Sequence, residues 1–291
     1  MDYVGYDLSP ILVTGANGYL GGHVLSMLRK RGIVAKGIGR SGQCDIYCDL
    51  CDPVATKTLI AQYPNSRIIH CAAAVPQSYE DYFDEVAASA SLEMVQNLVD
   101  ASPRHIVFIS SMTVYPEGTI LAREEDVIAP VGGYAASKYQ AERILLENLN
   151  ITATILRIPG LFGLPRKGGI LFNSALALAR GENPTMQPIL PQWAALHVED
   201  AADICIRAAL VTPNHSVVMN AGYPDRMAIS DAVTRLAYLF ERQVSVPPPK
   251  WFAFNLAKLD AHLGPVSGRF NDRLKDLADR ARMAEGTDHD A

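Results

Sequence analysis

The strongest constraint on the fold of this 291-residue chain is an alternation of short apolar runs with longer amphipathic stretches between residues 10 and 158. Runs such as "PILVTG", "RIIHCAA", "RHIVFISS" and "ITATILRI" are almost continuously apolar, as strands buried on both faces are. The stretches between them have the period of helices. Strands that alternate with helices form a parallel sheet, so the sequence predicts an α/β protein with a doubly wound parallel sheet, a Rossmann fold.

The pattern changes after Pro159. Gly and Pro become frequent in "PGLFGLPRKGG" and "GENPTMQPILPQW", and the segments "AISDAVTRLAYLF" and "WFAFNLAKLDAHL" look amphipathic. We therefore expect a dinucleotide-binding domain over residues 1–160 and a smaller, mostly helical C-terminal lobe over residues 161–291 that binds substrate. Parts of that lobe around residues 196–222 are expected to return to the sheet.

Composition excludes several classes of function. The net charge of −5 and the lack of clustered basic residues argue against a nucleic-acid surface. No apolar run reaches the roughly 18 residues of a membrane span. The start of the chain lacks the basic-then-apolar pattern of a secretory signal, so we expect a cytoplasmic protein.

The five cysteines, an odd number, favour reduced thiols over a disulfide framework. Cys44, Cys48 and Cys51 lie close together in "CDIYCDLCDP", which leaves a metal site open. A fourth ligand is not local, however, and structural zinc usually has paired ligand spacings. We favour small buried side chains and predict no metal.

A glycine-rich loop follows the first apolar run. In "TGANGYLG" three glycines permit a tight turn, a close approach of a pyrophosphate and close packing of the helix on the strand. The alternative is a turn that only caps the helix. The strand before and the helix after the loop favour a dinucleotide site. Its predicted contacts in this loop are Gly15, Asn17, Gly18, Tyr19, Leu20 and Gly21.

The end of the second predicted strand indicates which dinucleotide is bound. NAD sites usually place an acidic residue about 20 residues after the loop, where it bonds the ribose 2′-hydroxyl. Here the strand "VAKGIG" ends in Arg40 and Ser41. A guanidinium suits a 2′-phosphate, so NADP is favoured, with NAD as the alternative. An arginine that is simply exposed on a loop is the competing interpretation.

Three side chains are expected to meet at the carboxyl edge of the sheet, where doubly wound folds bind ligands. Ser111 ends the strand "RHIVFISS", and Tyr134 and Lys138 are one turn apart in "GGYAASKYQAER". A free tyrosine has a pKa near 10, and a nearby ammonium would lower it by favouring the phenolate. The serine hydroxyl could hold a substrate oxygen.

With these residues the chain resembles the extended short-chain dehydrogenase/reductase superfamily, in its NAD(P)-dependent nucleotide-sugar epimerase/dehydratase/reductase branch. The matching pieces are "TGANGYLG", "CDLCDP", "HCAA", "SSMTVY", "YAASK", "LRIPGLFG" and "HVEDAAD", in that order over roughly residues 10–205. The resemblance implies that Tyr134 is the acid/base, that Lys138 also holds the nicotinamide ribose and that Ser111 bonds the reacting oxygen.

The resemblance also implies further cofactor contacts. Asp49 and Leu50 would contact the adenine, the backbone would pack closely at Ala72 and Ala73, and Pro159 would lie near the nicotinamide amide.

At three places the sequence differs from the motifs of this branch, and these differences limit which reaction we expect. Dehydratases carry an Asp-Glu pair directly after the Ser/Thr, whereas Met112 and Thr113 stand here. Many nucleotide-sugar enzymes have an Asn three residues after the Arg of "LRIPGLFG", where this chain has Gly160. An Arg-Asp pair that binds the substrate diphosphate is replaced by Trp193 and Ala194. Dehydration is therefore not expected, and a substrate other than a nucleotide sugar stays open.

Other residues could replace the missing substrate contacts. Arg166 and Lys167 lie on a Gly-rich loop that could close over a phosphate, although solvated loop charge is an equal alternative. Trp193 could stack on a base or sugar, although large aromatic side chains are more often simply buried. His197 is interpreted as a packing residue.

Together these features predict an NADP-dependent reductase that transfers hydride to a ketone, most simply the 4-keto group of a nucleotide-linked deoxysugar. The alternatives are an NAD-dependent nucleotide-sugar 4-epimerase, a reductase of a non-sugar ketone or aldehyde, and a regulator that binds NADP without turnover. The resemblance suggests a homodimer through the helices around residues 84–101 and 132–149.

Overall fold

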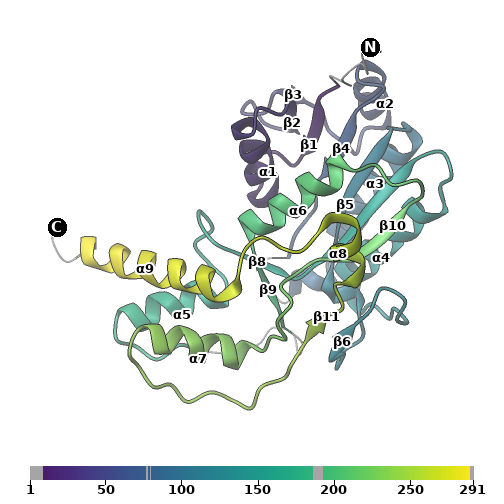
Figure 1. Ribbon diagram of the computed structural model, residues 1–291. Helices are drawn as coiled ribbons and strands as arrows, with labels where there is room; N and C mark the ends of the chain where they lie inside the picture. Colours follow the sequence, from purple (N-terminus) through teal and green to yellow (C-terminus); the bar gives the residue numbers. More distant parts are fainter. Residues whose placement is uncertain (1–8, 77, 79, 186–192, 289–291) are drawn as a thin grey trace, which may run out of the picture. The chain divides into compact units, whose positions relative to one another are not determined.

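The computed structural model describes residues 9–76, 78, 80–185 and 193–288. Its main feature is a seven-stranded sheet in the order β10-β7-β5-β4-β1-β2-β3 (Figure 1). The strands are β1 Ile11–Thr14, β2 Ala35–Gly39, β3 Ile46–Tyr47, β4 Arg67–His70, β5 His105–Ser111, β7 Thr152–Ile158 and β10 Val217–Asn220. The pairs from β3 through β5 are parallel. The predicted doubly wound α/β fold is confirmed.

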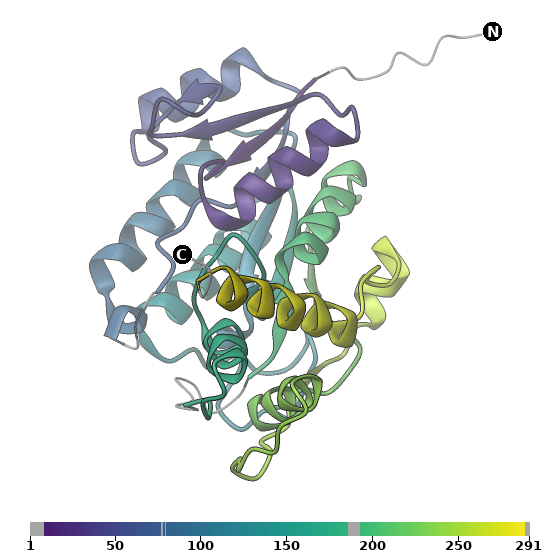
Figure 2. The ribbon, with the colours of Figure 1, turned by 90° about the vertical axis from the view of Figure 1, so that its left-hand side faces the viewer.

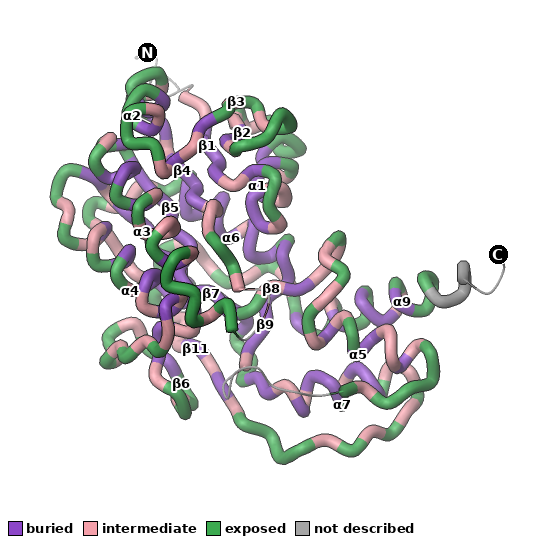
Figure 3. The backbone as a smooth tube through the Cα atoms, turned by 180° about the vertical axis from the view of Figure 1, so that it is seen from behind, coloured by how far each residue is buried: buried purple, intermediate pink, exposed green. Residues whose placement is uncertain are grey.

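Helices cover both faces of the sheet (Figure 2). They are α1 Tyr19–Lys30, α2 Pro53–Gln62, α3 Glu85–Asp100, α4 Gly132–Glu147 and α6 Val198–Leu210. Leu12, Ile68 and Ile106 face one side, where they share a core cluster with residues of α2, α3 and α4. Across the sheet α1 and α6 lie side by side, joined by an ion pair of 2.6 Å between Arg31 and Asp203. The central strands β1, β4, β5 and β7 are buried almost throughout, whereas β2 and β3 are partly exposed (Figure 3).

The order of the strands reverses at β1. The chain moves from β1 to β2 and β3 on one side, and then through β4, β5 and β7 on the other. The connections that leave β1 and β4 therefore diverge. In doubly wound sheets such a switch point is where ligands bind, outside the carboxyl ends of the strands.

The chain forms two compact units. The first holds residues up to 114, 130–157 and 202–219, and the second holds residues 115–129, 158–201 and those from 220 onward. The predicted division into domains at residue 160 stays a prediction, because the units are defined by packing and not by independent folding.

The second unit combines helices with short strands. Its two small sheets pair β6 Leu121–Ala122 with β11 Ala253–Phe254, and β8 Gly160–Phe162 with β9 Ala195–His197. Its helices include α5 Ile170–Ala179, α7 Ile229–Leu239, α8 Ala257–Leu263 and α9 Phe270–Asp288. The segment "WFAFNLAKLDAHL" is only half helical: its first part forms β11, because the backbone of Ala253 donates to Ile120 and pairs with β6.

Within the part of the chain that the structure describes, no helix is long and apolar enough to cross a membrane.

Candidate active site and cofactor groove

The glycine loop between β1 and α1 is shaped for close backbone contacts. Gly15 has φ +63°, and a Cβ there would lie 2.8 Å from the backbone nitrogen of Ala72. A Cβ on Gly21 would lie 2.2 Å from the carbonyl oxygen of Gly15. Neither position accepts a side chain, so both glycines are required by the turn itself. Gly18 is the N-cap of α1 and supplies no side chain to the first N–H groups of the helix, the kind of end that binds phosphates.

The switch point is fixed by a small polar network. The Thr14 hydroxyl oxygen accepts from the Ala72 N–H at 3.2 Å and lies 2.9 Å from the His70 Nδ1. Burial lowers the pKa of His70 to about 3, so its ring is neutral. This network holds the ends of β1 and β4 at a fixed distance beside the glycine loop.

A groove of about 410 Å³ lies along this edge of the sheet, within the first unit. Nine of the predicted cofactor residues line it: Gly15, Asn17, Gly18, Arg40, Ser41, Asp49, Leu50, Ala72 and Ala73. Tyr19, Leu20 and Gly21 form the first turn of α1 behind the loop. The groove runs from the glycine loop past the end of β2 to the end of β4, a shape that suits one half of a dinucleotide.

Sequence reasoning missed several residues that line the same groove. Ser91 and Met94 of α3 contribute, and so do Cys48 and Cys51. The Ser91 hydroxyl oxygen accepts from the Ala74 N–H at 3.1 Å and thereby shapes the chain after β4. Among the described residues, no group of three or more His, Cys, Asp or Glu side chains could hold a metal ion.

Charged side chains gather at the end of β2. The Arg40 side chain is 72% exposed and lies 4.0 Å from the Asp49 carboxylate, so it can turn toward a ligand at small cost. The nearby acid Asp45 is already engaged: it accepts from Arg29 at 2.6 Å and from the Gly37 N–H at 2.5 Å. We therefore do not expect Asp45 to accept a hydrogen bond from a ribose hydroxyl.

Ser111, Tyr134 and Lys138 come together where β5 ends and α4 begins. The Ser111 oxygen accepts from the Thr113 hydroxyl at 2.9 Å and from the Thr113 N–H at 3.2 Å. Its own proton is then available to Tyr134, and the hydrogen bond between them lowers the pKa of that phenol. The sequence marks Thr113 only as a missing acid, whereas in the structure it sets the direction in which Ser111 donates.

The expected lowering of the Tyr134 pKa by Lys138 is wrong for this arrangement. Burial and the neighbouring Tyr82, whose ring packs edge-on at 5.6 Å, raise the Tyr134 pKa above its usual value. The Lys138 ammonium lies 5.8 Å from the centre of the Tyr134 ring and donates to the Ile109 carbonyl at 2.8 Å. Because the ammonium is bound to the backbone and not to the phenol, burial determines the direction in which the Tyr134 pKa shifts.

Lys138 itself is 6% exposed. Burial lowers its pKa to about 8, while Cys71 and then Glu142 raise it. Cys71 directly precedes Ala72 of the groove, so the ammonium is next to the predicted cofactor site.

A buried ion pair lies under these groups and was not found from the sequence. Glu142, on α4, is fully buried and accepts from Arg157 of β7 at 2.7 Å and from the Ser110 hydroxyl. The signal for it is a third residue at the same spacing, because Glu142 follows Lys138 by four residues, as Lys138 follows Tyr134.

The remaining predicted residues lie in the second unit. Pro159 is buried between β7 and β8, Arg166 and Trp193 are half-buried, and Lys167 is exposed. None of them lines the large pocket of that unit. Their roles toward cofactor and substrate stay predictions.

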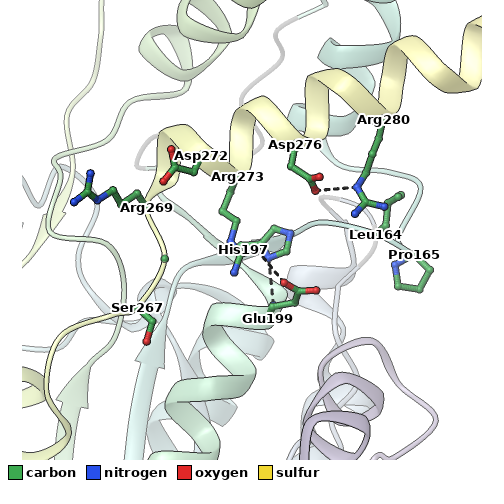
Figure 4. A pocket seen from close by; sticks show the side chains of 11 residues that line it. Leu164, Pro165, His197, Glu199, Ser267, Arg269, Asp272, Arg273, Asp276 and Arg280 are labelled. Atoms are coloured by element: carbon green, nitrogen blue, oxygen red, sulfur yellow. Dashed lines mark hydrogen bonds and ion pairs between the residues drawn. The ribbon is translucent and has the colours of Figure 1, made fainter. Parts of the chain in front are cut away.

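That pocket, of about 620 Å³, is bordered mainly by α9 and by the segment directly before it, with His197 and Glu199 opposite (Figure 4). Arg273 reaches from α9 to Asp200 at 2.6 Å and to Glu199 at 2.9 Å. Tyr223 donates to Asp200 at 2.5 Å. His197 packs edge-on against Phe162, as expected of a packing residue, and burial lowers its pKa.

With the geometry established, comparison with known proteins identifies the family. A family model described as "NAD dependent epimerase/dehydratase family" matches residues 11–222, well over half of the chain. The chain belongs to this family.

Curated relatives of this epimerase/dehydratase family member are moderately similar. The methionine adenosyltransferase 2 subunit beta of Pongo abelii is 29% identical over 209 residues, 68% of this chain and 61% of that protein. The dTDP-4-dehydrorhamnose reductase of Streptomyces griseus is 27% identical over 201 residues, 63% of this chain and 61% of that protein. The chain thus spans about three-fifths of the length of the curated relatives that it matches.

Solved structures show the same fold. The UDP-N-acetylglucosamine 4-epimerase of Bacillus cereus has a TM-score of 0.78 at 20% identity, over 94% of this chain and 96% of that one. The UDP-glucose 4-epimerase of Thermus thermophilus, solved in complex with NAD, has a TM-score of 0.74 at 20% identity, over 94% and 99%. The family model confirms the predicted epimerase/dehydratase resemblance, and the solved structures confirm the fold. That the substrate is a nucleotide sugar stays a prediction. The choice between NADP and NAD stays a prediction.

Proposed function

We propose that the chain is an NADP-dependent reductase that transfers hydride to the 4-keto group of a nucleotide-linked deoxysugar. The observation that carries the proposal is the meeting of Ser111, Tyr134 and Lys138 at the carboxyl end of β5, with Lys138 facing Cys71 beside the groove. The groove suits a dinucleotide, because its glycine loop turns tightly beside Ala72 at Gly15 and packs α1 closely on the end of β1 at Gly21.

The dihydronicotinamide supplies the hydride when the cofactor is bound. Tyr134 donates its proton to the carbonyl oxygen, and Ser111, whose oxygen already accepts twice from Thr113, donates a hydrogen bond to the same oxygen. Lys138 would hold the cofactor's ribose, and it places a positive charge near the phenolate that Tyr134 becomes. The raised pKa of Tyr134 keeps the phenol protonated until that step.

Reduction is favoured over dehydration by the two residues after Ser111. Met112 and Thr113 carry no carboxyl group, so neither can supply the acid and base that elimination of water needs. Arg40 favours a 2′-phosphate, and NADPH suits a net reduction. A relative named as a dTDP-4-dehydrorhamnose reductase supports this choice of substrate.

The test is a titration of the purified protein with NADPH and NADH, followed by nicotinamide fluorescence, in the wild type and in Arg40→Ala. A charge-assisted contact contributes about 1.5–3 kcal/mol, so Arg40→Ala should weaken NADPH binding about 10- to 100-fold and leave NADH binding unchanged. Arg143→Ala, which removes an exposed arginine of α4, is the matched control. Equal affinity for both cofactors in every variant would refute the choice of NADP.

A second candidate is an NAD-dependent nucleotide-sugar 4-epimerase, which is favoured by structural neighbours solved with NAD. Protein that is purified with NAD already bound would move this candidate to first place. Two nucleotide-sugar contacts are missing, at Gly160 and at Trp193. A reductase that acts on a non-sugar ketone or aldehyde is therefore a further alternative.

A third candidate, from a different class, is a cofactor-binding subunit without turnover. Several curated relatives are named as a subunit of methionine adenosyltransferase, which favours it. The complete Ser111, Tyr134 and Lys138 set supports an enzyme instead. We further expect a homodimer through α3 and α4 and a cytoplasmic location.

A further inference from the structure

The helix that carries Tyr134 and Lys138 also carries a buried acid that the proposed reaction does not use. Glu142 is 0% exposed, and both of its oxygens are engaged. Arg157 donates to it through Nη2 at 2.7 Å and through Nε at 3.1 and 3.2 Å. The Ser110 hydroxyl donates as well. Charged side chains are almost never buried unless they are paired in this way, so the position needs an explanation.

The pair ties together the three elements that hold the candidate catalytic groups. Glu142 lies on α4, Arg157 on β7, and Ser110 on β5 directly before Ser111. One turn earlier on α4, the Lys138 ammonium donates to the carbonyl of Ile109, also on β5. Two consecutive residues of β5 are thus bound to α4, which fixes the helix along the strand at the point where Ser111 must face Tyr134.

Glu142 also lies among the groups that surround the Lys138 ammonium. The ammonium is faced from the end of β4 by His70 and Cys71, from α4 by Tyr134 and Glu142, and from β5 by the Phe108 ring at 4.9 Å. At neutral pH the first three of these titratable groups carry no charge. Burial lowers the pKa of His70 to about 3 and raises the pKa of Cys71 to about 12, and the pKa of Tyr134 is raised as well. Glu142 is therefore the anion among the groups that face Lys138.

We propose that Glu142 is a positioning residue for the tyrosine–lysine pair: with Arg157 and Ser110 it fixes α4 against β5 and β7, and it places a carboxylate one helical turn from the Lys138 ammonium. The catalytic importance of Glu142 rests on the proposed function. Its test does not, because the charge on Lys138 can be measured in the cofactor-free protein.

The test compares Glu142→Gln with the double variant Glu142→Met/Arg157→Met. Glu142→Gln leaves Arg157 buried without its partner, which is expected to be strongly destabilising. In the double variant both charges are replaced by apolar side chains of similar size, a change that is often neutral for stability. The double variant therefore separates the stability of the fold from the charge beside Lys138. Glu147→Gln, which removes an exposed acid from the same helix, is the control.

The readout is the pKa of Lys138 in the full chain, followed by NMR of ¹³Cε-labelled lysine and assigned by comparison with Lys138→Arg. In the wild type and in Glu147→Gln we expect a value of about 8. We expect a lower value in the double variant although its urea midpoint stays near that of the wild type. At pH 7 we also expect NADPH binding to weaken about tenfold in the double variant.

A Lys138 pKa that is unchanged in the double variant would overturn the proposal, because Glu142 would then act on stability alone. If the wild type binds neither NADPH nor NADH, the proposed function fails. The NMR comparison would still decide whether Glu142 holds the charge on Lys138.

Discussion

Each compact unit contains a buried pair of a carboxylate and a guanidinium, and the two pairs differ in their access to water. The side chains of Glu142 and Arg157 in the first unit are 0% and 4% exposed. Those of Asp200 and Arg273 in the second unit are 4% and 26% exposed. Each carboxylate also accepts from a hydroxyl group. The chemistry is the same, but only the first pair is sealed from solvent.

The difference shows what each pair does. The sealed pair joins a helix to two central strands beside the candidate catalytic groups, where a small displacement would matter for chemistry. The open pair holds the second unit together instead. Arg273 belongs to α9, and a Cβ on Gly268 would lie 2.2 Å from Asp200, so the segment before α9 passes directly over the carboxylate. We expect changes at the first pair to alter catalysis and changes at the second to alter stability.

The largest effect should come from the phenol that the sealed pair positions. Tyr134→Phe removes the proton donor, and general acid catalysis contributes about 10²–10⁴-fold, so kcat should fall about 10³-fold. NADPH affinity and the melting temperature should stay near their wild-type values. Tyr139→Phe, a change of another tyrosine on the same helix, should keep full activity. Substantial turnover by Tyr134→Phe would remove the chemical role that we assign to the first unit.

The next effect concerns the open pair. Asp200→Asn breaks a mostly buried ion pair and should lower the free energy of unfolding by about 3 kcal/mol, measured by urea denaturation. Asp276→Asn breaks an exposed pair with Arg280 on the same helix and should cost no more than about 0.5 kcal/mol. The pKa of Lys138 should not change in either variant. A large change at Lys138 in Asp200→Asn would contradict the separation of the two pairs.

Acidification should lower the stability of the chain through buried histidines in both units. His70 and His105, both in the first unit, have pKa values that burial lowers to about 3 and about 4. Between these values and the usual 6.5, the unfolded chain binds protons that the folded chain does not. Stability should therefore fall as pH decreases from 6.5, by about 1.4 kcal/mol per pH unit for each histidine. The lowered pKa of His197 acts in the same direction. The pKa of Asp200 is lowered as well, so its contribution to stability is lost only when the pH falls below the usual pKa of an aspartate.

Urea midpoints at pH 7.5, 6, 5 and 4.5 measure this slope, and His105→Gln should reduce it. A free energy of unfolding that stays constant from pH 6.5 to 4.5 would mean that these histidines are protonated in the folded state.

The smallest effect should appear at Thr113. Thr113→Val removes the hydroxyl that donates to the Ser111 oxygen at 2.9 Å, so that only the Thr113 N–H, at 3.2 Å, still orients the serine. We expect kcat to fall about fivefold, since one hydrogen bond contributes about 1 kcal/mol. Thr113→Ser, which keeps the hydroxyl, should retain activity within about twofold. Equal activity of Thr113→Val and the wild type would show that Ser111 is oriented without Thr113.

The sequence predicted the first unit well because its signals are local. Period and composition predicted the strands and helices, and the glycines of the loop predicted a turn that leaves no room for a Cβ at Gly15 and Gly21. Nine predicted cofactor residues line one groove, because they follow the ends of neighbouring strands.

The remaining features depend on contacts between distant residues. Arg157 meets Glu142 only after β7 is placed beside β5, and Cys71 faces Lys138 only after β4 and α4 converge. The same holds for the pKa of Tyr134. The spacing to Lys138 suggested a lowered value, but burial and Tyr82 prevail in the folded chain. Spacing shows which side chains are neighbours, and it does not show how far water is excluded.

The most direct test of the account mixes the protein with NADPH deuterated at C4 of the nicotinamide and a nucleotide-linked 4-keto-6-deoxysugar such as dTDP-4-dehydrorhamnose. Mass spectrometry then follows the sugar while absorbance follows the cofactor. We predict that one deuterium reaches C4 of the sugar for each NADPH oxidised, and that Tyr134→Phe stops both. Inversion of a sugar centre without net oxidation of NADPH, or tight NADPH binding with no transfer to any carbonyl substrate, would contradict the reductase.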